Sequence, residues 1–187
     1  MMKPSPPLEF FVSIDIETSG PIPGEYSLLS IGACSVLQPR SNFYVELKPI
    51  NDNFTVEAMS IHHLSMAYLK EHGEDPAKAI SRFADWLAEQ VAQGQSLVFV
   101  AFNAGFDWMF MSYYFYHYLG RNPFGHAPLD IKAYYMGKYG VSWAETSMRY
   151  ISPRFLGNQP LTHHALRDAI DQADIFTQLL EVKNGTE

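Results

Sequence analysis

The chain has 187 residues, of which 47% are hydrophobic and 18% are charged, a composition that excludes an intrinsically disordered protein. The formal net charge of −7 excludes binding to nucleic acid through bulk positive charge alone. A single cysteine, Cys34, excludes an internal disulfide, and no stretch has 18 consecutive apolar residues. We therefore expect a cytoplasmic protein with no membrane association. The start of the chain, "MMKPSPPLEFF", also lacks the apolar region of a signal peptide.

Three strands are predicted at the start of the chain. Apolar and β-branched residues fill 9–16, 27–37 and 42–49, and two glycines and two prolines between 20 and 24 predict a turn after the first strand. Because the connections are short, the strands are expected to be antiparallel neighbours in a meander.

Segments with helical periodicity follow, and one clearly predicted strand separates them. Short helical pieces are predicted within 52–74, and apolar residues three and four apart predict an amphipathic helix over 75–93, capped by Asp75. The apolar run 96–102 predicts a strand buried on both faces, and a helix follows over 103–118. The remaining elements are a short strand at 128–130, helices at 131–138 and 142–150, a loop with Pro153, Gly157 and Pro160, and a helix over 164–182.

This order of elements predicts an α/β fold with a mixed sheet, in which parallel strands follow the antiparallel meander and helices flank the sheet. The length and the absence of a long linker favour a single domain over 1–187, with its core at about 9–182.

Four acids occur in apolar surroundings, where carboxylates are uncommon. Asp15 and Glu17 end the first strand and, being two residues apart, point to the same face. Asp107 lies one turn into the helix after the buried strand, and Asp168 lies on the last helix near two histidines. Since ligands of α/β sheets gather at strand ends, we hypothesise that these four side chains converge.

Converging carboxylates without cysteine form a site for a hard cation. Such a site suits Mg²⁺ or Mn²⁺, and two ions about 3.5–4 Å apart support phosphoryl transfer. Two divalent ions also offset part of the acidic net charge and explain why two adjacent acids are tolerated. A histidine can take the proton of the attacking water near neutral pH.

Three segments resemble the motifs of the DnaQ-like exonucleases, the DEDDh branch of the 3′→5′ exonucleases. The segments are "DIETSG", "NAGFD" and "HHALRD", in the family's order, and the resemblance spans roughly 9–182. It implies an RNase H-like fold and the stepwise hydrolysis of single-stranded DNA or RNA from the 3′ end to 5′-mononucleotides. Homodimers occur in the RNase T and oligoribonuclease branches, so a homodimer is an expectation here too. One departure is Phe102, since a histidine often precedes the motif asparagine in the family.

The resemblance also implies roles for individual residues. Asp15, Glu17, Asp107 and Asp168 match the metal ligands, and His163 matches the general base. The segment "AMSIHHLS" resembles the part that packs on the terminal nucleotide, which makes Ile61 and His62 substrate candidates. Three residues within the motifs join them as candidates for substrate binding: Thr18, Asn103 and Phe106.

The choice of the base depends on which argument is used. His164 and Asp168 are four residues apart and share a helix face, so geometry alone favours His164. The family spacing of five residues favours His163, on the loop that enters the helix, and we adopt that assignment.

Several of these residues also have structural interpretations. Asp130 is expected to cap the helix after it, and Asn103 is expected to cap its helix more than to contact substrate. Most rings of the aromatic segment 106–118 are expected in the core or at a dimer surface. Basic residues outnumber acids five to two between Arg121 and Arg154, which is consistent with either a solvated face or a surface for a nucleic-acid backbone.

Two other functions compete with the exonuclease. A phosphohydrolase restricted to dinucleotides or short oligonucleotides would fail on long substrates. A catalytically silent nucleic-acid-binding module would be expected to lack one of the acids or the histidine, and all five are present.

Overall fold

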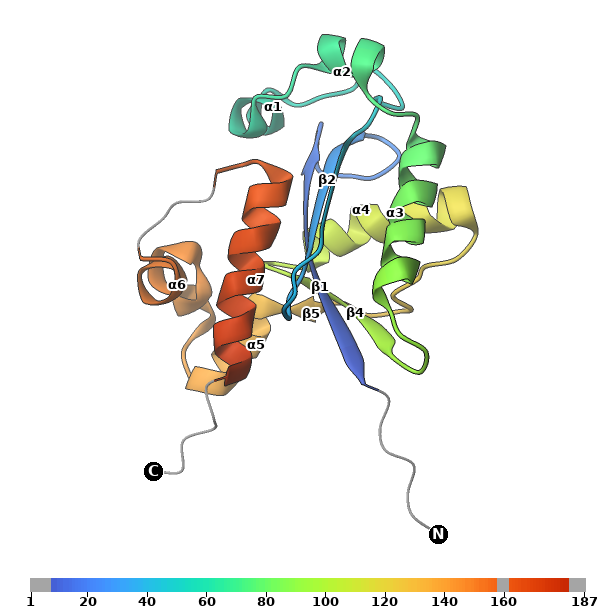
Figure 1. The fold of residues 1–187 in the computed structure, drawn as a ribbon. Coiled ribbons are helices and arrows are strands. Elements are labelled where there is room, and N and C mark those ends of the chain that lie inside the picture. The colour runs from blue at the N-terminus through green and yellow to red at the C-terminus, as the bar shows by residue number, and fades with distance from the viewer. Residues whose placement is uncertain (1–7, 158–161, 182–187) are drawn as a thin grey trace.

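The computed structural model describes residues 8–157 and 162–181. A mixed sheet of five strands runs through the molecule in the order β3-β2-β1-β4-β5 (Figure 1). The first three strands form the predicted antiparallel meander, and β4 and β5 are parallel to β1 and to each other. The predicted α/β fold is therefore confirmed. The strands are β1 (Glu9–Thr18), β2 (Leu28–Ser35), β3 (Asn42–Glu46), β4 (Ser96–Ala101) and β5 (Leu129–Asp130).

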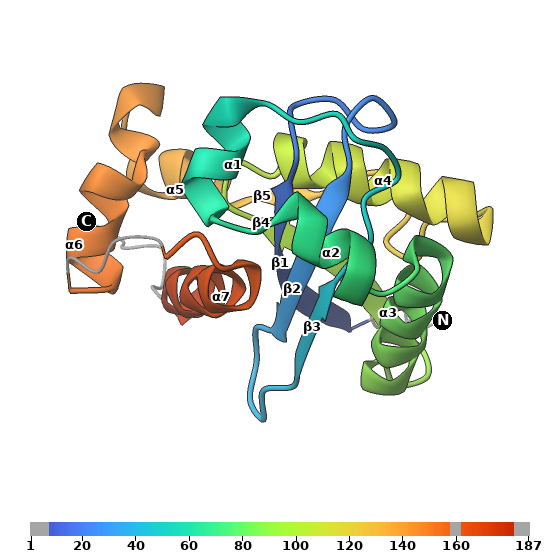
Figure 2. The same ribbon diagram turned by 90° about the horizontal axis from the view of Figure 1, so that it is seen from above.

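Helices cover both faces of the sheet, and α1 and α2 lie across one end of it (Figures 1 and 2). One face packs against α3 and α4, and the other packs against α7 and α5, with α6 on the outer side of α7. The helices are α1 (Val56–His62), α2 (Met66–His72), α3 (Pro76–Gln90), α4 (Gly105–Leu119), α5 (Ile131–Tyr139), α6 (Met148–Phe155) and α7 (Ala165–Glu181), with a 3₁₀ turn at Trp143–Thr146.

Some predicted boundaries of helices and strands differ from those in the structure. The helix predicted over 75–93 begins with the predicted Asp75 cap but ends at Gln90. The region 142–150 contains a 3₁₀ turn and then α6, which runs on through Pro153 to Phe155. Strand β4 is fully buried only from Phe99 to Ala101. Pro160 and Val182 lie outside the described residues.

The aromatic helix α4 separates into two faces. Its inner face, with Phe110, Tyr114 and Phe115, is buried in the core, as the sequence predicts. Met109 and Tyr116 are exposed on the outer face, and their contact with a second copy of the chain stays a prediction. No helix among the described residues, α4 included, combines the length and the apolar character needed to cross a membrane.

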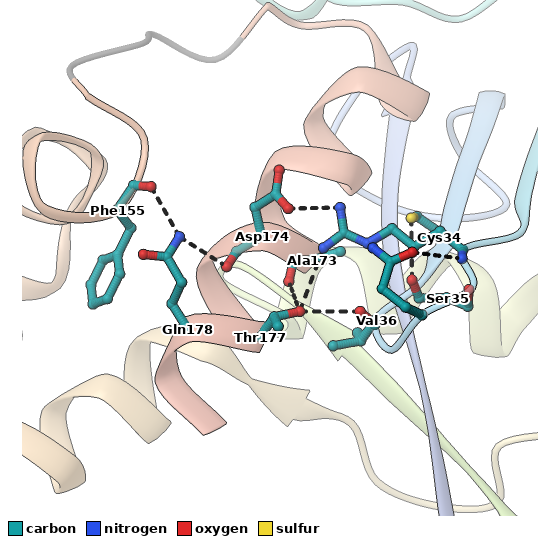
Figure 3. Close-up of polar contacts among 10 residues, drawn as sticks. Cys34, Ser35, Val36, Phe155, Ala173, Asp174, Thr177 and Gln178 are labelled. Atoms are coloured by element: carbon teal, nitrogen blue, oxygen red, sulfur yellow. Dashed lines mark hydrogen bonds and ion pairs between the residues drawn. The ribbon is translucent and has the colours of Figure 1, made fainter. Parts of the chain in front are cut away.

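Helix α7 is fixed to the β2–β3 loop and to α6 by polar contacts of its residues 174–178 (Figure 3). Asp174 pairs with Arg40 at 2.7 Å, and its side chain remains 44% exposed. The Thr177 hydroxyl lies 3.1 Å from the carbonyl oxygen of Val36, and Gln178 donates to the carbonyl of Phe155 at 3.1 Å. These contacts hold the helix that carries Asp168 in one position.

Candidate active site

A glycine in the middle of β2 lets α7 approach the sheet closely. Gly32 is the register partner of Asp15, and a Cβ atom built on it would lie 2.1 Å from the carbonyl carbon of Ala165. The first turn of α7 therefore rests directly on the strand backbone. Because Asp168 lies in that first turn, the close contact brings its carboxylate to the end of β1.

Three of the four predicted acids form one cluster. Carboxylate oxygens of Asp15, Glu17 and Asp168 lie within 4.8 Å of one another. Asp168 is 2% exposed, and its oxygens accept hydrogen bonds from the N–H and hydroxyl of Thr162 and from the N–H of His163. Among the described residues, no lysine or arginine forms an ion pair with any of the three. The cluster is a buried negative site without a protein cation.

Asp107 lies beside this cluster without belonging to it. It occupies the first turn of α4 and is buried, and its charge acts on both Asp15 and Glu17. The backbone N–H of Ile16 in β1 binds the Asp107 carboxylate and lowers its pKa, against the larger effect of burial. Ile16 lies past Ser13, the last residue of β1 that pairs with β4. Of the four acids that were expected to converge, three thus lie together and the fourth, Asp107, lies next to them.

Burial and mutual repulsion keep these acids from ionising easily. Burial, with the negative charges of Asp168 and Asp107, raises the pKa of Glu17 to about 8. Burial also raises the pKa of Asp107 to about 8, against the N–H groups that lower it. The pKa of Asp15 is raised well above its ordinary value by burial and then by the three neighbouring acids. A divalent cation would oppose all three shifts, because its positive charge favours the ionised carboxylates.

One amide side chain positions the first acid. Gln172, one helical turn after Asp168, donates from Nε2 to Oδ1 of Asp15 at 2.7 Å. Its Oε1 accepts the N–H of Phe102 at 2.8 Å, and the side chain is buried. Sequence reasoning missed this residue, although a glutamine among the apolar residues of α7 is an available signal.

The two adjacent histidines have different surroundings. His164 stacks its ring on Tyr44 of β3, with centroids 4.8 Å apart. His163 precedes the helix in a left-handed conformation (φ 52°) and is exposed, with its N–H bound to Asp168. Burial lowers the pKa of His62 on α1, and the charge of His163 lowers it further, so the two histidines lie near each other.

A pocket of about 400 Å³ opens beside the cluster, with Glu17 in its wall. Four of the five substrate candidates line it, whereas Asn103 does not. Sequence reasoning missed the other lining residues, since proline, threonine and alanine in a turn and a short helix carry no specific signal. The lining comprises Ile16, Glu17, Thr18, Gly20, Pro21, Thr55, Glu57, Ala58, Ile61, His62 and Phe106.

The polar groups of two substrate candidates are already engaged inside the protein. The Thr18 hydroxyl donates to the carbonyl of Gly20 at 2.9 Å. His62 Nε2 lies 3.1 Å from the carbonyl oxygen of Thr18, and Nδ1 accepts the N–H of Leu64 at 3.0 Å. The His62 bonds tie α1 to the end of β1, so both residues shape the pocket wall.

Two capping predictions have opposite outcomes. Asp130 caps α5 as expected, accepting the N–H of Ala133 at 2.7 Å, and its second oxygen accepts the N–H of Ala104 at 2.6 Å. The prediction that Asn103 caps α4 is wrong, because the helix begins after Ala104 and has no side-chain cap bond. Asn103 instead makes the sharp turn from β4 to α4 with a positive φ of 64°, which asparagine tolerates.

The donor set of the cluster fits a hard divalent cation. Three carboxylates converge without sulfur or imidazole among them, and carboxylate oxygens are the ligands of Mg²⁺ and Mn²⁺. The raised pKa values of Asp15 and Glu17 and the absence of a paired protein cation, among the described residues, are the observations expected of a metal site.

Comparisons with known proteins agree with this geometry. The model of the RNase T exonuclease family matches residues 12–176. The 3′-5′ DNA exonuclease Cap18 of Escherichia coli is 46% identical over 172 residues, which cover 90% of each chain.

Solved structures show the same fold at low sequence identity. The nuclease domain of 3′hExo, a DEDDh family member bound to rAMP, has a TM-score of 0.75 at 15% identity, covering 93% of this chain and 92% of that one. Exonuclease I of E. coli in complex with a dT13 oligonucleotide has a TM-score of 0.72 at 16% identity, covering 92% of this chain and 41% of that one. These neighbours confirm the RNase H-like fold.

Proposed function

Since this chain belongs to the DnaQ-like family of 3′→5′ exonucleases, we propose that it removes nucleotides from the 3′ end of single-stranded DNA. The preference for DNA over RNA is supported by the relative at 46% identity, which is a DNA exonuclease. The proposed products are 5′-mononucleotides.

The observation that carries this proposal is the position of the pocket. Glu17 belongs both to the acidic cluster and to the wall of a pocket of about 400 Å³. A volume of this order holds a small ligand of about nucleotide size. A terminal nucleotide in this pocket would place its 5′ phosphodiester at the acids, which favours cleavage from an end over cleavage within a strand.

We propose that Asp15, Glu17 and Asp168, with Asp107 beside them, hold two divalent cations, Mg²⁺ or Mn²⁺. Such ions activate the attacking water and stabilise the leaving 3′ oxygen. Gln172 keeps one oxygen of Asp15 fixed, and the N–H groups of Thr162 and His163 do the same for Asp168. The protein thereby supplies ligands whose orientation is set in advance.

His163 is the proposed general base. Its exposed imidazole stands on a loop next to Asp168, whereas the ring of His164 is stacked on Tyr44. An imidazole at this place can accept the proton of a water that attacks the phosphorus.

The test uses 5′-labelled single-stranded DNA and RNA of equal sequence, incubated with Mg²⁺, Mn²⁺ or EDTA. We expect a ladder that shortens from the 3′ end, faster on DNA, and absent with EDTA or in an Asp15→Asn variant. Shortening of dinucleotides and trinucleotides only would replace this proposal with an oligonucleotide-specific phosphohydrolase. Binding of both polymers with no shortening at all would indicate a silent binding module.

A further inference from the structure

The α5–α6 region carries positive charge that the protein does not neutralise. Between residues 129 and 157 lie four basic residues and two acids, in a chain whose net charge is −7. Both acids are engaged in caps: Asp130 binds two backbone N–H groups, and Glu145 binds the N–H and hydroxyl of Ser142. Among the described residues, none of the four cations has a carboxylate within 4.0 Å.

These cations lie over aromatic rings instead. Lys132 Nζ is 4.2 Å from the ring centroid of Trp143 and 5.9 Å from that of Phe102. Arg154 lies 3.9 Å above the ring of Tyr139 in the same way. Trp143 is 52% exposed, so a large part of its indole surface is open to a ligand.

A chain of contacts connects Lys132 and Trp143 to the acidic cluster. Asp15 binds Gln172, and Gln172 binds the N–H of Phe102 where β4 ends. The ring of Phe102 then contacts the ammonium group of Lys132, which reaches Trp143. The nucleotide pocket involves a different set of elements, the end of β1, α1 and the start of α4. Asp130, the cap of α5, also binds the N–H of Ala104 at the start of α4, whose Phe106 lines the pocket, so α5 begins close to the pocket and the 5′ part of a bound strand would have it within reach.

We propose that Lys132 and Trp143 bind nucleotides beyond the first one on the 5′ side of the scissile bond, Lys132 through a phosphate and Trp143 by stacking on a base. The inference rests on the proposed exonuclease function. A base can stack on indole whatever its identity, because every base has a π-face. An ammonium group without a carboxylate partner is free to contact phosphate, and the cation–π contact holds it in place meanwhile. The surface would bind single strands of any sequence and would make long substrates better than short ones.

The test compares Trp143→Ala and Lys132→Ala with the wild type on two substrates, a dinucleotide and (dT)15. For Trp143→Ala we expect kcat/KM on (dT)15 to fall about tenfold, the order of one lost stacking contact, with no change on the dinucleotide. Trp143→Tyr keeps a stacking ring and should retain most of the activity. Lys78→Ala is the matched control, because Lys78 is exposed on α3, across the sheet from this surface.

Binding is measured separately from turnover, by anisotropy of 5′-fluorescein-labelled (dT)15 with EDTA present. Lys132→Ala should weaken binding and reduce the slope of log K against log salt by about 0.7, the value for one phosphate contact on a single strand. Lys132→Arg should keep the slope. If the wild type binds (dT)15 in EDTA but cuts nothing with Mg²⁺, the proposed exonuclease function fails. The binding test then still decides whether Lys132 and Trp143 contact the strand. Equal losses on both substrates, or unchanged binding by both alanine variants, would overturn the inference.

Discussion

Gln172 joins Asp15 to Phe102: its Nε2 donates to Oδ1 of Asp15 at 2.7 Å, and its Oε1 accepts the Phe102 N–H at 2.8 Å. Because each end of the amide has one role, the amide cannot flip without losing both bonds. Asp15 of β1 is thereby fixed relative to the end of β4, although Asp15 and Gln172 are 157 positions apart in the chain.

Replacement of Gln172 should weaken the metal site without removing a ligand. For Gln172→Ala we expect a 10- to 100-fold loss of Mg²⁺ affinity or activity, the usual effect of removing a group that orients a ligand. Activity titrated against Mg²⁺ should recover in part at high metal concentration. Gln178→Ala is the control, since Gln178 lies on the same helix but binds the carbonyl of Phe155 away from the acids (Figure 3). Equal effects of the two variants would show that Gln172 acts through helix stability alone.

A second prediction concerns Gly32, on which α7 rests. In Gly32→Ala the new Cβ would meet the Ala165 backbone at 2.1 Å, so α7 has to shift. Overpacking of this kind costs about 1–3 kcal/mol, or roughly 2–10 °C in Tm for a chain of this size. The shift also moves Asp168 away from Asp15, so the rise in Tm on adding Mg²⁺ should shrink.

Gly137→Ala is the matched control for Gly32→Ala. Gly137 lies inside α5 with open space at its Cβ position, so alanine should stabilise the helix by about 0.5–1 kcal/mol. Thermal melts with and without Mg²⁺ measure both effects. A Gly32→Ala protein with an undiminished Mg²⁺ response would contradict the assigned role of this close approach.

The case of Gly32 shows why the sequence predicts the acidic residues better than the contacts that position them. Asp15 and Glu17 were predictable because carboxylates are unexpected at the end of a buried strand. They also belong to the first of the three motifs that resemble those of the exonuclease family. A glycine within β2 signals a close contact but does not say with what. The partner, the start of α7, is more than 130 positions away, and only the packed fold brings them together.

Two other contacts could not be predicted because they depend on residues distant in the chain. Asn103 was expected to cap α4, but the turn places its backbone in the left-handed region and Asp130 binds the helix start instead. Periodicity also does not reveal that Asp174 pairs with Arg40, which arrives from the β2–β3 loop. The mixed α/β fold and the antiparallel pairing of the first three strands, by contrast, follow from apolar periods and connection lengths, and these were predicted correctly.

A third prediction separates the two histidines. His163→Ala should lower the single-turnover rate on labelled (dT)15 by at least about 100-fold, the order of a lost general base. His164→Ala removes the ring that stacks on Tyr44 and should cost less than tenfold in rate, with a lower Tm. Each variant is the control for the other, since they are neighbours. A large loss of rate in His164→Ala with an active His163→Ala protein would reverse the assignment.

The last prediction concerns pH and follows from the raised pKa values of the acids. Unfolded, Glu17 and Asp107 ionise near 4.5 and 3.8, whereas burial raises the pKa of each to about 8 in the folded, metal-free protein. Between these values the folded state holds protons that the unfolded state has released, so the free energy of unfolding falls as pH rises. This stability is fully present below about pH 4 and is lost by about pH 8.

Magnesium should reverse this loss, because it binds the ionised acids and displaces their protons. At 100 times its dissociation constant, a ligand adds about 2.7 kcal/mol, which corresponds to roughly 5–10 °C in Tm here. The difference in Tm between Mg²⁺ and EDTA should therefore be small at pH 5.5 and increase toward pH 8. Glu17→Gln carries no ionisable group at that position, so its metal-free Tm should fall less over the same interval. A Tm difference that stays constant from pH 5.5 to 8 would show that these acids are already ionised in the metal-free protein.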